Sequence, residues 1–190
     1  CRSVIAMKSK MKSDYYSEVK ISAQDAASYL RLMFLSNHWT VHVDKIEKKI
    51  VTKLLELNDK KTIKNQHVLD LGMGPGRWSK FFLKAGFGKV TGLDIQPDMI
   101  VQAKKRIRNS NFRAIKADMM ELPFKKSSFE KVFSFRSIKY VQNLDRVLAE
   151  IYRVLMPCGT FVVEFPNKSL LIQLASWILS VVPLRMKSVR

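Results

Sequence analysis

The stretch VLDLGMGPGRW, residues 68–78, constrains the fold of this chain more than any other part of the sequence. It begins as a short apolar run, continues through Gly72, Gly74 and Gly76, and ends where a helical pattern starts. A buried strand, a glycine loop and a helix in this order usually cradle a phosphate. This loop, however, also carries a carboxylate, Asp70, at its mouth. The predicted ligand must therefore suit both a glycine loop and a negative charge.

The sequence after this stretch alternates between strand and helix patterns. Short apolar segments predict strands at residues 67–71, 89–95, 111–118, 129–135 and 160–165. Helical spacing of apolar residues predicts helices at residues 42–57, 77–85, 97–108, 144–155 and 169–182. Strands that alternate with helices indicate right-handed βαβ units and a mostly parallel sheet. The sequence therefore predicts an α/β fold.

Three aspartates, Asp70, Asp94 and Asp118, stand at the ends of successive predicted strands, where parallel sheets bind their ligands. A pyrophosphate beside an unpaired carboxylate is disfavoured by like-charge repulsion. The third glycine of a GxGxxG dinucleotide motif is replaced by Arg77, and no GK[ST] of a P-loop follows. A cationic nucleoside without phosphate suits the acids better. S-adenosylmethionine, with its ammonium and sulfonium groups, is such a ligand.

Each acid has an expected role toward this ligand. Asp70 would face the positive charge directly or through water, and Asp94 would accept hydrogen bonds from both ribose hydroxyls. Asp118 would accept from the adenine amino group, while the Met119 amide would donate to a ring nitrogen. Two structural alternatives stay open. The glycines could serve only as a tight strand–helix turn, and Asp94 and Asp118 could be helix N-caps.

Four stretches, VLDLGMGPG, VTGLDIQPDMI, AIKADMMELPFKKSSFEKVFSF and LAEIYRVLMPCGTFVVEF, resemble in this order the motifs of class I S-adenosylmethionine-dependent methyltransferases. The subgroup called type 11 methyltransferases is the most similar, over about residues 67–166. The resemblance implies a Rossmann-like three-layer sandwich with strand order 3-2-1-4-5, and S-adenosylmethionine as the cofactor. It also implies a cofactor site that consists of Asp70, Gly72, Gly74, Gly76, Asp94, Ile95, Asp118, Met119 and Phe135. Ile95 and Met119 would lie against adenine, and the backbone near Phe135 beside the methionine moiety.

The chain departs from the family pattern in two places. Met73 stands where family members usually have a small residue or Cys, which is tolerable if its side chain points into the core. After residue 165 we find one apolar helical segment and a short basic tail, so we expect the final antiparallel strands to be missing. We expect residues 1–60 to form an N-terminal helical or lid segment, with Tyr16 and Trp39 as lid candidates. Residues 61–190 would form a C-terminally truncated methyltransferase domain.

Methyl transfer to an acceptor depends mainly on alignment, because the sulfonium is already a good leaving group. The sequence offers no compelling general base, and the catalytic residues therefore stay unassigned. Arg136, Lys139 and Tyr140 follow the fourth predicted strand, where the acceptor should enter, and are the candidates for acceptor contacts. The leading hypothesis is an enzyme that methylates a small-molecule or lipid-like acceptor. The segment FSFRSIKY has no Asn-Pro-Pro-Tyr type element, which weighs against amino methylation of adenine or glutamine.

The net charge of the chain suggests partners other than a small molecule. The 34 Lys and Arg residues outnumber the 16 Asp and Glu residues, for a net charge of +18, which attracts RNA and anionic membranes. A tRNA or rRNA methyltransferase is therefore one alternative. A non-catalytic methyltransferase-fold binding module is another, motivated by the missing strands, and a nicotinamide dehydrogenase is a distant third.

Metal binding and a membrane span are not expected. His38 and His42 are spaced as a helical pair, but they lack a glutamate placed as in HExxH. The longest apolar run, residues 170–184, falls short of the roughly 20 residues that span a bilayer. Two cysteines far apart in the sequence suit a reducing compartment. We therefore expect a cytoplasmic protein.

Overall fold

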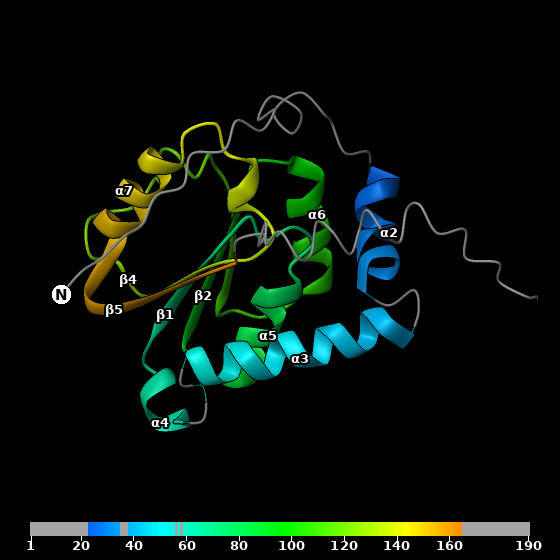
Figure 1. Ribbon diagram of the computed structural model, residues 1–190, viewed down its shortest axis with the longest axis horizontal. Coiled ribbons are helices and arrows are strands. Elements are labelled where there is room, and N and C mark those ends of the chain that lie inside the picture. Colours follow the sequence, from blue (N-terminus) through cyan, green and yellow to red (C-terminus); the bar gives the residue numbers. More distant parts are fainter. Residues whose placement is uncertain (1–22, 35–37, 56, 58, 165–190) are drawn as a thin grey trace, which may run out of the picture.

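The computed structural model describes residues 23–34, 38–55, 57 and 59–164 (Figure 1). Its centre is a five-stranded sheet with the order β3-β2-β1-β4-β5, and all four pairings are parallel. The strands are β1 (His67–Leu71), β2 (Lys89–Asp94), β3 (Phe112–Lys116), β4 (Phe129–Ser134) and β5 (Leu155–Val163). The strand order expected from the sequence is confirmed.

Helices cover both faces of this sheet. They are α2 (Ala23–Phe34), α3 (His38–Leu54), α4 (Lys60–Ile63), α5 (Arg77–Ala85), α6 (Pro97–Arg106) and α7 (Leu144–Val154), with a 3-10 turn, η1 (Ile138–Tyr140). Figure 1 shows α7 on one side of the sheet and α3 and α5 on the other. The described residues therefore form the three-layer sandwich that the sequence predicts.

The two faces of the sheet have separate hydrophobic cores because successive strand residues point to opposite sides. Val68 of β1 and Phe133 of β4 pack with Phe82 of α5 and with Val51 of α3. Their neighbours in the strands face the α7 side, where Leu69, Leu71, Val132, Val147 and Ile151 form the second core. The N-terminal helix α3 therefore shares a core with the sheet.

Aromatic rings fill much of the core between α5 and the sheet. The Trp78 ring centroid lies 4.9 Å from that of Phe133 and 5.1 Å from that of Phe135. Phe82 contacts Phe133 edge-on, with 5.0 Å between the ring centroids. Edge-on and tilted aromatic pairs stabilise a core beyond the area that they bury. This cluster holds α5, and with it the glycine loop, against the strands.

Met73 lies in the glycine loop and is buried, with 4% of its surface exposed. It packs against Ile100 and Ala103 of α6. The expectation that this side chain points into the core is confirmed. A flexible thioether fills the irregular space between the loop and α6, which explains how the larger residue is accommodated.

The last strand differs from its predicted bounds. Pro157 and Gly159 read as a turn, so the sequence predicted a strand at residues 160–165, whereas β5 begins at Leu155 directly after α7. Leu155 pairs with Phe129 and Thr160 pairs with Lys131, so residues 156–159 form an irregularity within the strand. The turn residues are therefore accommodated as a bulge. Cys158, within this irregularity, is exposed.

A cluster of charged side chains ties α3 to the sheet domain. The Arg77 guanidinium, 8% exposed, lies with Nη2 2.6 Å from Asp44 and 2.5 Å from Glu47, both of α3. Glu47 also pairs with Arg136 after β4 at 2.5 Å. Although burial opposes ionisation of Asp44, hydrogen bonds from Lys48 and Arg77 outweigh it and keep the pKa of Asp44 below its ordinary value. The helix is thus anchored beside the glycine loop.

Two expectations concern residues that the structure does not describe. The missing antiparallel strands and the helical segment at residues 169–182 both fall after residue 164, outside the described part. Tyr16 also lies outside it. None of the helices in the described ranges could span a bilayer.

Replacement of Arg77 should destabilise the fold far more than replacement of its neighbour Lys48. Arg77→Met leaves two largely buried carboxylates without their shared cation, which should lower the free energy of unfolding by about 2–4 kcal/mol. Lys48→Met removes a more exposed pair within α3 and should cost less than about 1 kcal/mol. Urea unfolding followed by circular dichroism measures both. Equal losses for the two variants would show that the Arg77 cluster does not anchor α3.

Candidate functional site

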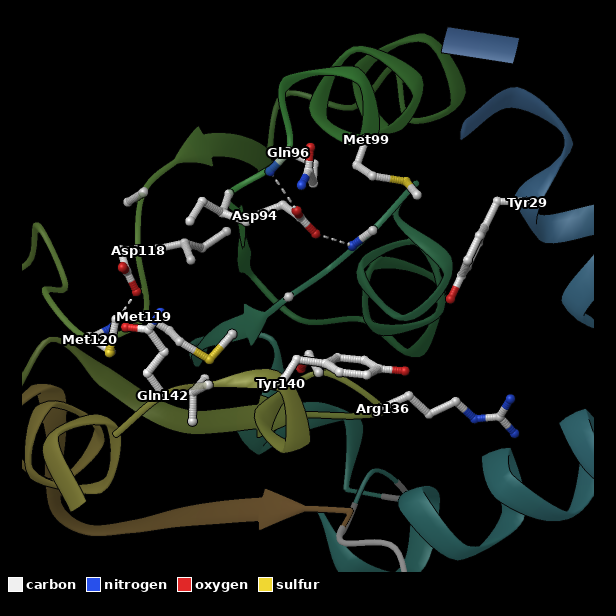
Figure 2. A pocket seen from close by; sticks show the side chains of 17 residues that line it. Tyr29, Asp94, Gln96, Met99, Asp118, Met119, Met120, Arg136, Tyr140 and Gln142 are labelled. Carbon is white, nitrogen blue, oxygen red and sulfur yellow. Dashed lines mark hydrogen bonds between the residues drawn. The ribbon is translucent and has the colours of Figure 1, made fainter. Parts of the chain in front are cut away.

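A cavity of about 290 Å³ opens at the carboxyl ends of β1, β2 and β3 (Figure 2). Its lining comes from the glycine loop, the end of β2 with the start of α6, and the segment after β3. The loop after β4 with η1, and Tyr29 of α2, complete it. The cavity therefore lies at the edge of the sheet where a parallel α/β fold binds its ligands.

The structure brings most of the predicted site residues to this cavity. Six of the nine predicted cofactor residues line it, namely Gly72, Gly74, Asp94, Ile95, Asp118 and Met119. Two of the three acceptor candidates, Arg136 and Tyr140, line it as well. Asp70, Gly76, Phe135 and Lys139 are not part of the lining.

Asp94 ends β2 and is held by the backbone around it. Its Oδ2 accepts a hydrogen bond from the Gly74 amide at 2.8 Å, and its Oδ1 accepts one from the Gln96 amide at 2.9 Å. Burial raises the pKa of this carboxyl. Gln96, not Asp94, is the N-cap of α6, so the capping alternative is wrong for Asp94. Each carboxylate oxygen keeps a further lone pair for a ligand hydroxyl.

Asp118 follows β3 and is half-buried at the cavity wall. Its Oδ1 accepts a hydrogen bond from the Met120 amide at 2.8 Å. The segment that follows is a turn rather than a helix, so the capping alternative is wrong for Asp118 too. Figure 2 shows Asp118 beside the Met119 and Met120 side chains. A carboxylate and two thioethers thus form one end of the cavity.

Asp70 does not line the cavity, contrary to the expectation that it faces the ligand. Its side chain points from β1 toward α5, where Oδ2 accepts a hydrogen bond of 2.6 Å from the buried Ser79 hydroxyl. Only 2% of Asp70 is exposed. Burial raises its pKa to about 7, although the hydrogen bonds from Ser79 act in the opposite direction. The geometry assigns this carboxyl to the attachment of α5 to β1.

Three more predicted residues lie outside the cavity lining. Gly76 caps α5 in the left-handed conformation, with φ of 80°, and lies against α6. The Phe135 ring stacks on Phe133 at 5.7 Å in the aromatic core, because side chains of alternate residues along β4 share a face. The Lys139 ammonium lies 4.9 Å from the centroid of the Tyr140 ring.

Gly72 and Gly74 serve different structural purposes in the loop. A Cβ on Gly72 would lie 2.2 Å from the Cβ of Ser137, so Gly72 permits the loop after β4 to approach. The Ser137 hydroxyl donates to the Leu71 carbonyl at 2.8 Å and fixes this approach. Gly74 has φ of 54°, and a Cβ there would meet open space. Gly72 is therefore needed for packing, whereas Gly74 leaves the cavity wall open.

Several lining residues were not predicted from the sequence. Tyr29 of α2 faces the cavity from the side opposite Asp94 and Asp118, as Figure 2 shows. Only the aromatic content of residues 15–39 pointed to it, and the lid prediction fell on Tyr16 and Trp39 instead, whose side chains are outside the described part. Ser137, Met99 and Gln142 had no signal in the sequence. In the described ranges no group of three or more His, Cys, Asp or Glu residues could hold a metal ion.

Asp70 leads to a specific prediction about stability and pH. The folded state holds this carboxyl with a pKa of about 7, against an ordinary 3.8, so it binds a proton that the unfolded chain releases. The corresponding contribution to the free energy of unfolding is complete below about pH 4 and is lost as the pH rises to about 7. Asp70→Asn keeps the shape of the side chain but cannot titrate, so the variant should not show this decrease in the free energy of unfolding.

Urea unfolding of wild type and Asp70→Asn at about pH 5 and pH 8 measures the effect. The difference between the two proteins isolates Asp70 from other groups, such as His67, whose pKa burial lowers to about 4. The exposed Asp145→Asn variant is the control and should follow wild type. The assignment would be wrong if wild type and Asp70→Asn lost the same stability between the two pH values.

Comparison with known proteins identifies domains that this chain resembles. Residues 68–159 match a family model described as a methyltransferase domain. A sterol 4-C-methyltransferase of Caenorhabditis elegans is 35% identical over 118 residues, which cover 60% of this chain and 33% of that protein. A malonyl-[acyl-carrier protein] O-methyltransferase of Erwinia billingiae is 36% identical over 94 residues, which cover 50% of this chain and 36% of that protein. The chain therefore spans about a third of the length of these curated relatives.

A solved structure of a methyltransferase is also similar to this chain. The crystal structure of an S-adenosylmethionine-dependent methyltransferase from Mesorhizobium loti is 26% identical and has a TM-score of 0.51. The similarity covers 53% of this chain and 47% of that one. Together with the strand order and the glycine loop, these matches show that residues 68–159 are similar in sequence and fold to the methyltransferase domain of S-adenosylmethionine-dependent methyltransferases.

Proposed function

We propose that this chain binds S-adenosylmethionine in the described cavity and belongs to an enzyme that methylates a small-molecule or lipid-like acceptor. The observation that carries the proposal is the placement of Asp94, Asp118 and the open Gly74 around one cavity at the carboxyl ends of the strands. The acceptor class rests on the two relatives, which are named for a sterol and for malonyl-[acyl-carrier protein].

The charges around the cavity favour a cation over a phosphate. Asp94 and Asp118 contribute carboxylates to the lining. Arg136 contributes a guanidinium, but this group is paired with Glu47 at 2.5 Å. A diphosphate would therefore lie beside two carboxylates, with its natural partner already engaged, and like-charge repulsion would oppose it. The residues present fit a nucleoside that carries ammonium and sulfonium groups.

Several residues would hold this cofactor. The lone pairs of Asp94 that point away from the Gly74 and Gln96 amides are available to ribose hydroxyls. Asp118 would accept from the adenine amino group, and Met119 would contribute its amide and its side chain to the adenine ring. Ile95, which is 46% exposed at the cavity edge, would cover the ring from the other side.

The contribution of the protein to the reaction would be mainly orientation. When bound, S-adenosylmethionine supplies an activated methyl group on a cationic sulfur. The residues on the opposite side of the cavity, Tyr29, Arg136 and Tyr140, would position the acceptor and exclude water from the methyl group. This side presents two phenol groups and a guanidinium to the cavity. The lining includes no histidine.

RNA is the second candidate acceptor, because the net charge of +18 would attract a polyanion. Incubation of the protein with methyl-labelled S-adenosylmethionine and a cell extract distinguishes the candidates. Label in the lipid or small-molecule fraction is expected. Label in RNA would replace the proposed acceptor class, and binding of S-adenosylhomocysteine without any transfer would indicate a non-catalytic binding module.

The cofactor site can be tested without knowledge of the acceptor. Asp94→Ala removes a buried hydrogen-bond acceptor and should weaken S-adenosylhomocysteine binding about 10- to 100-fold, whereas Asp118→Ala, at a half-buried position, should weaken it about 3- to 10-fold. Isothermal titration calorimetry measures both. Asp145→Ala, an exposed acid in the first turn of α7, is the matched control and should bind normally.

Thermal unfolding must accompany this measurement, because Asp94 also accepts the Gly74 amide. A variant that stays folded and binds S-adenosylhomocysteine as tightly as wild type would exclude Asp94 from the cofactor site. An unchanged affinity in Asp118→Ala would in the same way remove the adenine contact.

A further inference from the structure

The outer face of α3 carries two rows of side chains that run along the helix. One row is apolar and consists of Ile46, Ile50 and Leu54, which are 46%, 52% and 53% exposed. The other row is basic and consists of Lys45, Lys49 and Lys53, which are all exposed. Residues four apart lie on the same side of a helix, one turn above another. Ile46 and Ile50 therefore each have a lysine three residues on, Lys49 and Lys53, as a neighbour on the helix surface.

The inner face of α3 shows the opposite arrangement of charge. Val51 is buried in the core. The two acids of the helix, Asp44 and Glu47, pair with Arg77 and Arg136 of the sheet domain. Acidic groups thus point inward and lysines point outward. The outer face of α3 is therefore positively charged as well as apolar.

The apolar row differs from the other exposed hydrophobic side chains of the described residues. Those others, Ile95, Val101, Tyr152 and Met156, are spread over separate elements of the fold. Single exposed apolar residues need no explanation, but a contiguous row marks an interaction surface. Figure 1 shows α3 along one edge of the molecule, followed by α4 at its C-terminal end.

The basic row and the apolar row together indicate which kind of partner the outer face of α3 would bind. An RNA backbone would neutralise the lysines but would leave the isoleucines and the leucine in contact with phosphates and water. An anionic bilayer satisfies both rows, because lysines bind lipid phosphates while apolar side chains enter the acyl boundary. The exposed Lys60 and Lys61 of α4 extend the basic surface, while Asp59, the N-cap of α4, is the acid beside them.

We propose that the outer face of α3 docks on the surface of an anionic phospholipid bilayer. The net charge of +18 would draw the protein toward such a surface, and the two rows would fix its orientation there. Glu47, adjacent to Ile46, pairs with Arg136 of the cavity lining, so one ion pair joins the docked helix to the cavity. Docking itself requires no methyl transfer and stands independently of the proposed function.

Flotation of the full 190-residue chain with vesicles tests this inference. Vesicles of phosphatidylcholine with phosphatidylserine should bind the protein, and vesicles of phosphatidylcholine alone should bind it weakly. Lys45→Gln/Lys49→Gln/Lys53→Gln should reduce the partition coefficient about a hundredfold, since each lysine near an anionic surface contributes about fivefold. Ile46→Gln/Ile50→Gln/Leu54→Gln should reduce it at least about tenfold.

The matched control removes the same charge elsewhere, through the exposed lysines in Lys104→Gln/Lys105→Gln/Lys116→Gln, and should change binding only a few-fold. Equal losses in the two lysine variants would overturn the proposal, because net charge alone would then explain binding. A triple apolar variant that melts several degrees below wild type would also overturn it, because the face would then be covered within the protein. The proposal would also be overturned if the α3 variants lost a dimer in ultracentrifugation but bound vesicles as wild type does. The same holds if these variants lost binding to single-stranded RNA and kept their binding to vesicles.

Discussion

The glycine loop after β1 is hydrogen-bonded to the end of β2, and the shape of the cavity depends on this link. The Gly72 and Met73 amides both donate to the Leu93 carbonyl, at 2.8 and 3.0 Å, and the Gly74 amide donates to Asp94 at 2.8 Å. These bonds satisfy loop amides that would otherwise need water. They also hold the Asp94 carboxylate in a fixed place at the cavity wall. The loop, the strand end and the candidate ribose contact therefore form one rigid unit.

The carboxylates of the described residues differ in the direction in which they point, and this direction determines their role. Asp70 faces α5 and is closed off by Ser79, so it holds the helix and not the ligand. Asp94 and Asp118 face the cavity and leave its wall negative. Asp44 and Glu47 face the sheet domain and neutralise its arginines. These five acids thus point into internal contacts or toward the cavity, whereas Lys45, Lys49 and Lys53 of α3 lie on the outer surface.

The sequence predicted the elements that local chemistry determines. The bounds of β1 and α5 agree with the prediction because the apolar run and the glycines mark them directly. Asp70 was misplaced because the face that a strand residue adopts depends on sheet packing. The start of β5 was missed because pairing with β4 overrode the turn signal of Pro157 and Gly159. Tyr29 reaches the cavity only through the tertiary position of α2, which no local pattern encodes.

Arg136 joins the cavity to the N-terminal helices, and its backbone shows how firmly it is fixed. It has φ of 57°, a conformation that costs a non-glycine residue about 1–3 kcal/mol. Two carboxylates offset this cost: Glu164 accepts from the Arg136 amide at 2.8 Å, and Glu47 pairs with its guanidinium. An anionic acceptor that approached the guanidinium would compete with Glu47 and loosen α3. A neutral acceptor would leave this ion pair intact and, under the proposed function, would disturb α3 less than an acidic one.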